Sequence, residues 1–340
     1  MEGNRVMNIP IKNIIIEKGV RDYMLTASII RNLPESMVVS SDTDLPAKEG
    51  MPRDMEKDTI RIIDFKGEFL KPCPGTKEYI CCGYQILNVG TNCPMDCSYC
   101  ILQAYFNKPS LRVFANLEKE LDVIGSIIDS HPERIFRIGT GEFTDSLALD
   151  PITGWSGLLT EFFTGKKNAV LELKTKTDNI GGLLSSPHRD RIIVSWSLNS
   201  AEISAREEHG AASIKKRLEA AKRCQDEGYV VSFHFDPLIH YEGWEKDYLK
   251  TIELLGDYID PKGVIWISMG CFRYIPALKH IVRRRHPNTH ILDGEFIKGL
   301  DGKMRYFKPI RILMYSLIKE YLERWHNDLG LYLCMESDEI

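Results

Sequence analysis

The chain has 340 residues, 43% of them apolar, and a formal net charge of -4 at pH 7. This length suits one barrel-sized domain with a small addition, and the apolar fraction is enough to fill its core. The charge balance excludes a global basic surplus, so any nucleic-acid site must be a local patch. No apolar run reaches the roughly 18 residues that cross a bilayer, and no signal core opens the chain. We therefore expect a cytoplasmic protein without membrane contact.

The first part of the chain predicts a small α/β element followed by a linker. β-like runs stand at 12–17 and 37–40, with helical spacing at 20–32 between them. The stretch 41–58 is rich in Asp, Pro, Glu and Lys, which indicates a linker or surface loop, and a strand is expected again at 59–65.

From there on, strand and helix patterns alternate, so we divide the chain into an N-terminal element at 1–80 and a main domain at 81–340 with a C-terminal extension. Repeated strand, helix and strand units imply parallel pairing with right-handed crossovers. Six units predict an incomplete (β/α)6 barrel of the TIM type, with its site at the carboxyl ends of the strands. The six predicted strands are 84–89, 135–138, 169–174, 191–198, 229–235 and 263–269, and the predicted helices include 117–130, 213–227 and 244–255.

Three closely spaced cysteines, Cys93, Cys97 and Cys100, follow the first of these strands. Cytosolic thiols stay reduced, which favours thiolate ligation over a disulfide framework. The spacing places three thiolates on one loop, enough for three irons of a cubane with the fourth iron open. The alternatives are a zinc site or buried structural cysteines, but zinc typically takes a separate second ligand pair, and Cys73 and Cys81-Cys82 lack that spacing. The motif therefore predicts a 4Fe-4S cluster.

The C-x3-C-x2-C motif, with the aromatic Tyr99 before its third cysteine, resembles that of the radical S-adenosylmethionine superfamily. The resemblance implies that the methionine amine and carboxylate of S-adenosylmethionine chelate the open iron, and that one-electron reduction yields a 5'-deoxyadenosyl radical. A reductant such as flavodoxin or ferredoxin is the expected electron donor. The run from Gly139 through Gly141 to Glu142 is similar to the superfamily's glycine-glycine-glutamate element, whose carboxylate would accept hydrogen bonds from the methionine ammonium.

Four further polar residues are candidates for cofactor binding. Lys176 closes the third strand, and Ser197 and Asn199 close the fourth, where a cation could meet the cofactor carboxylate and polar groups its ribose. Lys176 and Asn199 could equally be solvated loop residues. Arg217, early in an amphipathic helix, could reach the same carboxylate or form a surface ion pair.

A closer resemblance, to the spore photoproduct lyase family, runs in order from about Tyr84 to the C-terminus. It rests on the cysteine motif, Thr175-Lys176, Ser197-Leu198-Asn199, the run 216–221 and above all the run 237–245. The resemblance implies an incomplete α/β barrel. It also implies repair of a methylene-bridged thymine dimer in spore DNA, by hydrogen abstraction with the deoxyadenosyl radical.

The chain departs from the family at two positions. The family carries a cysteine after the second strand that returns a hydrogen atom to the thymine radical, and Glu142 stands there instead. The family also has a tyrosine after the third cluster cysteine, where this chain has Ile101. Cys271 and Cys334 are the candidates for a relocated donor, although each could be an ordinary packed cysteine. The chain is therefore a lyase for a thymine dimer in DNA or a paralogue with a non-DNA substrate.

Two basic stretches could contact DNA, 279–286 with three consecutive arginines and 303–308 with interleaved aromatic residues. Three consecutive arginines on a helix cannot face one way, which favours a solvated helix end at 283–285. Tyr241 and Trp244 could be pocket walls or core. An alternative from another class is a non-catalytic metal or nucleic-acid binding module.

Overall fold

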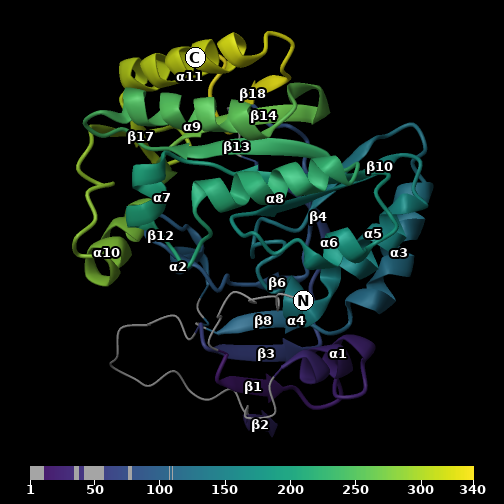
Figure 1. Ribbon diagram of the computed structural model, residues 1–340. Coiled ribbons are helices and arrows are strands. Elements are labelled where there is room, and N and C mark those ends of the chain that lie inside the picture. Colours follow the sequence, from purple (N-terminus) through teal and green to yellow (C-terminus); the bar gives the residue numbers. More distant parts are fainter. Residues whose placement is uncertain (1–10, 34–37, 42–56, 76–78, 107, 109) are drawn as a thin grey trace.

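Figure 1 shows the computed structural model of the chain, in which residues 11–33, 38–41, 57–75, 79–106, 108 and 110–340 are described. The helices are α1 (Met24–Asn32), α2 (Leu102–Tyr105), α3 (Leu117–Asp129), α4 (Asp150–Thr153), α5 (Trp155–Thr164), α6 (Gly181–Ser185), α7 (Ala201–Glu207), α8 (Ile214–Asp226), α9 (Trp244–Tyr258), α10 (Pro276–Arg285) and α11 (Lys308–Trp325), with a 3-10 turn at Pro261–Gly263.

The main sheet is a curled layer with helices packed on its outer face (Figure 1). Its strand order is β18 (Leu331–Leu333), β14 (Val264–Cys271), β13 (Val230–Leu238), β11 (Ile192–Ser197), β10 (Ala169–Thr175), β9 (Phe136–Gly139), β5 (Gln85–Leu87) and β4 (Leu70–Pro72). The six strands from β5 to β14 are parallel and follow the chain order. The predicted incomplete barrel is confirmed. The edge strands β4 and β18 went unpredicted because runs of three residues carry almost no periodicity.

The helix α8 illustrates why the predicted helices form where they do. The Ser213 hydroxyl accepts a hydrogen bond from the amide of Lys216 at 3.4 Å and so caps the first turn. Ile214, Leu218 and Ala221 recur at helical spacing and are buried against the sheet. The helix ends before Gly228, whose φ of +88° turns the chain toward β13.

A second sheet joins the N-terminal part to the main domain. Its strand order is β2 (Val38–Ser41), β1 (Asn13–Ile16), β3 (Thr59–Ile63), β8 (Leu111–Phe114) and β6 (Gly90–Thr91). The three predicted N-terminal strands are therefore present, and nearly all of the predicted linker lies outside the described residues. A Cβ on Gly90 would collide with the carbonyl of Arg112, so β6 needs a glycine to approach β8. Because β6 and β8 flank the cysteine loop, the N-terminal element and the main domain share a sheet and a continuous apolar core.

Two small sheets complete the fold. One joins β7 (Asp96–Cys97) to β12 (Glu208–His209), and the other has the order β15 (Arg273–Tyr274), β17 (Met304–Tyr306) and β16 (Phe296–Lys298). Among the residues that the structure describes, no helix is both long and apolar enough to cross a bilayer.

Candidate active site

A cavity of about 350 Å³ lies at the carboxyl ends of the parallel strands. The three cysteines of the motif line it, together with residues at or just past the carboxyl ends of β9, β10, β11, β13 and β14. Of the other predicted site residues, those that line the cavity are Tyr99, Gly141, Glu142, Lys176, Ser197 and Cys334. Those outside its lining are Gly139, Asn199, Arg217 and Cys271.

The backbone of the cysteine loop is held by protein contacts on every side. Before the first cysteine, Asn92 has φ of +67° and its amide donates to the carbonyls of Lys108 and Ser110 at 2.9 and 2.7 Å. At its centre, β7 pairs antiparallel with β12, which sets Cys97 opposite Glu208. After the third cysteine, the amide of Gln103 donates to the carbonyls of Cys97, Ser98 and Cys100 at 3.1, 3.0 and 3.3 Å, which fixes the turn.

The donor set fits a 4Fe-4S cluster with one open iron. Burial raises the pKa of Cys93 to about 12 and also raises that of Cys97, so bound iron would have to displace both protons. Within the described part of the chain, no three His, Cys, Asp or Glu side chains converge closely enough to hold a single metal ion. A mononuclear zinc site needs such convergence, whereas each thiolate of a cubane binds a different iron.

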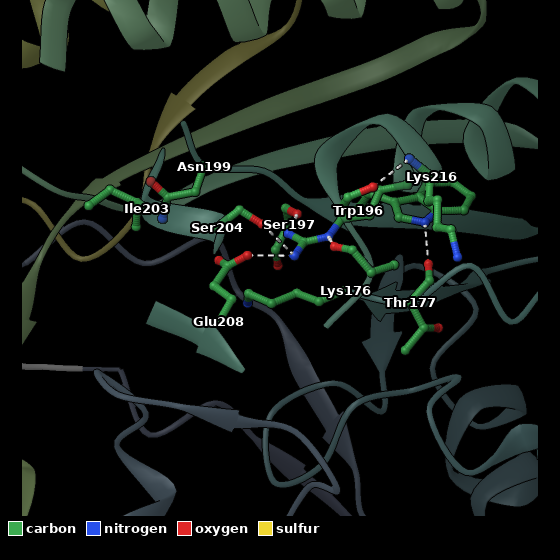
Figure 2. A network of polar contacts seen from close by, with 12 residues as sticks. Lys176, Thr177, Trp196, Ser197, Asn199, Ile203, Ser204, Glu208 and Lys216 are labelled. Atoms are coloured by element: carbon green, nitrogen blue, oxygen red, sulfur yellow. Dashed lines mark hydrogen bonds and ion pairs between the residues drawn. The ribbon is translucent and has the colours of Figure 1, made fainter. Parts of the chain in front are cut away.

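Behind the loop lies a buried ion pair that the sequence did not reveal (Figure 2). Glu208 accepts hydrogen bonds from the Tyr99 hydroxyl and, at 2.5 Å, from the Arg217 guanidinium. Burial opposes its ionisation, but Arg217 and Lys176 lower the pKa of Glu208 below its ordinary value. The adjacent acids Glu207 and Glu208 look like a solvated helix end in sequence, so no local signal marked either.

Arg217 is completely buried, which corrects the expectation of a surface ion pair. Besides Glu208, it donates to the carbonyls of Ala212 and Ser197 at 2.8 and 2.9 Å and to the hydroxyl of Ser204 at 3.2 Å. Arg217 therefore positions the end of β11, where Ser197 meets the cavity, from outside the cavity lining.

The glycines of the second motif pack against their neighbours. A Cβ on Gly139 would collide with the Tyr84 hydroxyl, and one on Gly141 would lie 2.9 Å from Cβ of Lys174. Beside them, Glu142 faces the cavity and makes no hydrogen bond or ion pair with another described residue. Burial opposes the charge of Lys174, but Glu142 and Glu172 raise its pKa above the ordinary value. The Glu142 carboxylate and the Lys174 ammonium thus lie on the same wall of the cavity.

The cavity floor contains two charged groups that sequence reasoning missed. Glu172 on β10 accepts hydrogen bonds from Arg137 at 2.8 Å and Ser195 at 2.8 Å, and its carboxylate lies 2.7 Å from Nε2 of His234. Asp236 forms an ion pair with Arg273 at 3.1 Å. The only available signals were Glu172 inside the predicted strand 169–174 and Asp236 directly after the predicted strand 229–235.

The two candidate donor cysteines occupy different places. Cys271 is buried with its sulfur 3.9 Å from that of Met314 on α11, outside the cavity lining. Cys334 lines the cavity, with its sulfur 3.9 Å from Arg273 Nη2. Cys73, Cys81 and Cys82 also line the cavity, although none was a candidate for its chemistry.

The remaining polar and aromatic candidates are structural in this arrangement. The Asn199 amide donates to the Pro237 carbonyl at 3.0 Å and accepts from the Tyr248 hydroxyl at 2.5 Å, so it is not a solvated loop residue. Trp244 belongs to the core, and Tyr241 packs beside it without lining the cavity.

Each basic stretch contains exposed residues as well as paired or buried ones. Arg285 lies 2.7 Å from Asp96 on the cysteine loop, and only 9% of its side chain is exposed. The expectation of a solvated helix end at 283–285 is therefore wrong for Arg285. In the second stretch, Lys303 lines the cavity, Arg305 is buried beside Asp301, and Phe307 is exposed.

An incomplete α/β barrel with a C-x3-C-x2-C loop in the cavity at its strand ends defines the class of radical S-adenosylmethionine enzymes. The sequence model of the spore photoproduct lyase family matches residues 79–316, and the chain belongs to that family. Enzymes of this family use a 4Fe-4S cluster and S-adenosylmethionine.

Known relatives agree with this placement. The spore photoproduct lyase of Clostridium acetobutylicum is 22% identical over 332 residues, which cover 94% of this chain and 96% of the relative. That of Bacillus subtilis is 26% identical over 209 residues, or 60% and 61% of the two chains.

Among solved structures, a mutant spore photoproduct lyase with dinucleoside spore photoproduct superposes with a TM-score of 0.83 at 21% identity, over 95% of this chain and 98% of that one. Another mutant, with bound AdoMet and the dinucleoside spore photoproduct, gives the same values. These matches show that the fold is shared.

Proposed function

We propose that the chain acts on a thymine-dimer photoproduct in DNA with a radical made from S-adenosylmethionine. When bound, the cluster and S-adenosylmethionine supply a 5'-deoxyadenosyl radical by one-electron cleavage of the sulfonium. The observation that carries the proposal is the cavity, which combines the three cluster thiols with charged groups from the neighbouring strands. Family membership and solved relatives that hold dinucleoside spore photoproduct support the choice of substrate.

In this proposal the cavity walls orient the methionine end of the cofactor. Glu142 accepts hydrogen bonds from its ammonium, since no described residue donates a hydrogen bond to that carboxylate. Lys176, whose Nζ lies 5.9 Å from the centre of the Tyr99 ring, meets the methionine carboxylate, and Ser197 meets the ribose. Tyr99 closes the cavity behind the cluster through its bond to Glu208.

Cys334 is the proposed hydrogen donor, because it lines the cavity and Cys271 does not. Burial raises the pKa of Cys334 to about 12, so the sulfur keeps its hydrogen at neutral pH. In the donor step the S–H bond breaks, a C–H bond forms on the substrate radical, and a thiyl radical remains on the protein. A carboxylic acid such as Glu142 cannot replace it, because its O–H bond is too strong.

The second candidate function is a family paralogue with a non-DNA substrate. The replacement of the family's donor cysteine by Glu142 favours it, because a site that no longer returns a hydrogen atom from that position could serve another reaction.

The test is an anaerobic product assay on the dinucleotide photoproduct in D2O with reconstituted protein. A thiol exchanges with solvent, so the proposed reaction releases 5'-deoxyadenosine and places one solvent deuterium in the repaired thymine. Cys334→Ser should remove the deuterium and the matched Cys271→Ser should keep it.

Release of 5'-deoxyadenosine without repair, in both the wild type and Glu142→Cys, would support the paralogue instead. A gain of repair in Glu142→Cys alone would mean that the cavity accepts the photoproduct and lacks only a donor.

A further inference from the structure

The C-terminal end of α10 carries exposed cations that the proposed reaction does not use. Arg283 and Arg284 are exposed, and the half-buried Lys279 lies one turn before Arg283 on the same face of the helix. None of the three makes a hydrogen bond or ion pair with another residue that the structure describes. We call these three residues the basic tip. The basic tip is a local cluster of positive charge on a chain whose net charge is -4.

The residue that follows the basic tip contacts the cysteine loop. The next residue, Arg285, forms an ion pair with Asp96 at 2.7 Å and donates to the side-chain carbonyl of Gln103. Asp96 precedes the ligand Cys97, and Gln103 holds the carbonyls of the loop. The Asp96 side chain is 34% exposed and also pairs with Lys57 at 2.9 Å. The loop therefore reaches solvent at this point, bordered by cations.

The basic tip lies outside the substrate cavity. No residue of α10 lines that cavity, whose cations are Arg137, Lys174, Lys176, Arg273 and Lys303. A substrate that must enter the cavity has no need of α10. A partner that only has to come close to the cluster needs the surface where the loop reaches solvent.

We propose that the basic tip and the exposed part of the cysteine loop form the docking surface for an acidic one-electron carrier protein. The proposal rests on the proposed function, because each cleavage of S-adenosylmethionine consumes one electron. Opposite charges steer such encounters and speed association, and interfaces of electron carriers are small and transient. Arg285 and Lys57, which pair with Asp96, together with the neighbouring basic tip on α10 meet that requirement.

The test uses the cluster-loaded protein and its Arg283→Glu/Arg284→Glu variant, with reduced flavodoxin as the acidic carrier. The matched control is Lys222→Glu/Arg223→Glu, which changes the charge equally on the exposed face near the last turn of α8. That turn precedes the amino end of β13, on the rim opposite the cavity. At low salt the apparent second-order rate constant for flavodoxin-driven formation of 5'-deoxyadenosine should fall about tenfold in the first variant and stay unchanged in the control.

A second readout does not depend on turnover. The affinity for oxidised flavodoxin is measured by calorimetry, with and without the cluster. It should be weaker in the tip variant than in the wild type and should depend much less on ionic strength. Photoreduced deazariboflavin, an uncharged small reductant, should drive the wild type and the tip variant equally. If it drives neither protein, the proposed function is wrong, whatever the binding shows.

Two results would overturn the docking proposal. One is equal flavodoxin binding and equal flavodoxin-driven rates in wild type and tip variant. The other is a tip variant that loses affinity for duplex DNA but keeps its response to flavodoxin, which would make the basic tip a DNA contact.

Discussion

At the scale of single residues, the nine cysteines separate into groups with different surroundings. Cys93, Cys97 and Cys100 share one braced loop, whereas Cys81 and Cys82 are exposed at the cavity edge and Cys224 is buried in α8. Position, rather than the mere presence of thiols near the cavity, therefore distinguishes the proposed cluster ligands from the other cysteines.

Replacement of Cys93, Cys97 or Cys100 by Ala should abolish the absorbance of the 4Fe-4S cluster and all cleavage of S-adenosylmethionine, because a cubane needs all three thiolates. Replacement of Cys73, Cys81 or Cys82 should spare both. Iron content and the visible spectrum after anaerobic reconstitution measure the effect. Stoichiometric iron in the triple Ala variant would refute the assignment.

Glu142→Gln tests the cofactor-binding wall. Loss of a charged hydrogen bond in a partly dry cavity weakens binding by about 2 kcal/mol, or about thirtyfold in the dissociation constant. Equilibrium binding of S-adenosylmethionine to the cluster-loaded variant measures it, with an unchanged cluster spectrum as the control. An unchanged dissociation constant with altered products would place Glu142 on the substrate side.

At the scale of elements, the strand β12 matters most, because it connects the fourth barrel strand to the cysteine loop. It pairs with β7 and carries Glu208, the partner of both Tyr99 and Arg217. Four elements, β7, α7, β12 and α8, thus meet around one buried ion pair.

Breaking this pair should destabilise the protein strongly. Arg217→Met leaves the Glu208 charge buried without its partner and should lower the free energy of unfolding by about 3–5 kcal/mol. The double variant Arg217→Met/Glu208→Gln should recover much of that loss. Urea unfolding of the apoprotein measures both. The control is Arg206→Met, which removes an exposed pair with Glu202 and should cost at most about 1 kcal/mol.

Sequence patterns predicted the elements well and the contacts between them poorly. The six strands from β5 to β14 and the cysteine loop follow from local periodicity and spacing. The bonds from Tyr99 to Glu208 and from Arg285 to Asp96 join residues 109 and 189 positions apart. Such pairs leave no trace in one sequence, because each charged residue taken alone looks solvated. The same limit hid Glu172 and the buried position of Arg217.

At the scale of the whole molecule, several buried acids in and beside the barrel are paired with cations. Glu172, Glu208 and Asp236 all lie against cations, and although burial opposes ionisation, those cations lower the pKa of all three below the ordinary values of 4.5 and 3.8. The folded state therefore binds fewer protons than the unfolded state in acid.

This difference predicts the direction of acid denaturation. The stability that these carboxylates contribute is fully present above their unfolded pKa and is lost as the pH falls below roughly 4.5 and through their folded values. The free energy of unfolding of the apoprotein should accordingly decline on that acid limb. Glu172→Gln should have a lower free energy of unfolding than the wild type at neutral pH. Between about pH 5 and about pH 3, however, it should lose less of that free energy than the wild type does. An equal loss in both proteins would show that Glu172 titrates normally.

The pairing of β7 with β12 also bears on how the protein responds when oxygen destroys the cluster. Small metal domains whose ligands are brought together only by the metal unfold when it leaves. Here peptide hydrogen bonds from β12 and the amide of Gln103 keep the ligand loop in shape by themselves. We therefore expect the loop to keep its shape when oxidation removes the iron, so that the cluster can be rebuilt without refolding.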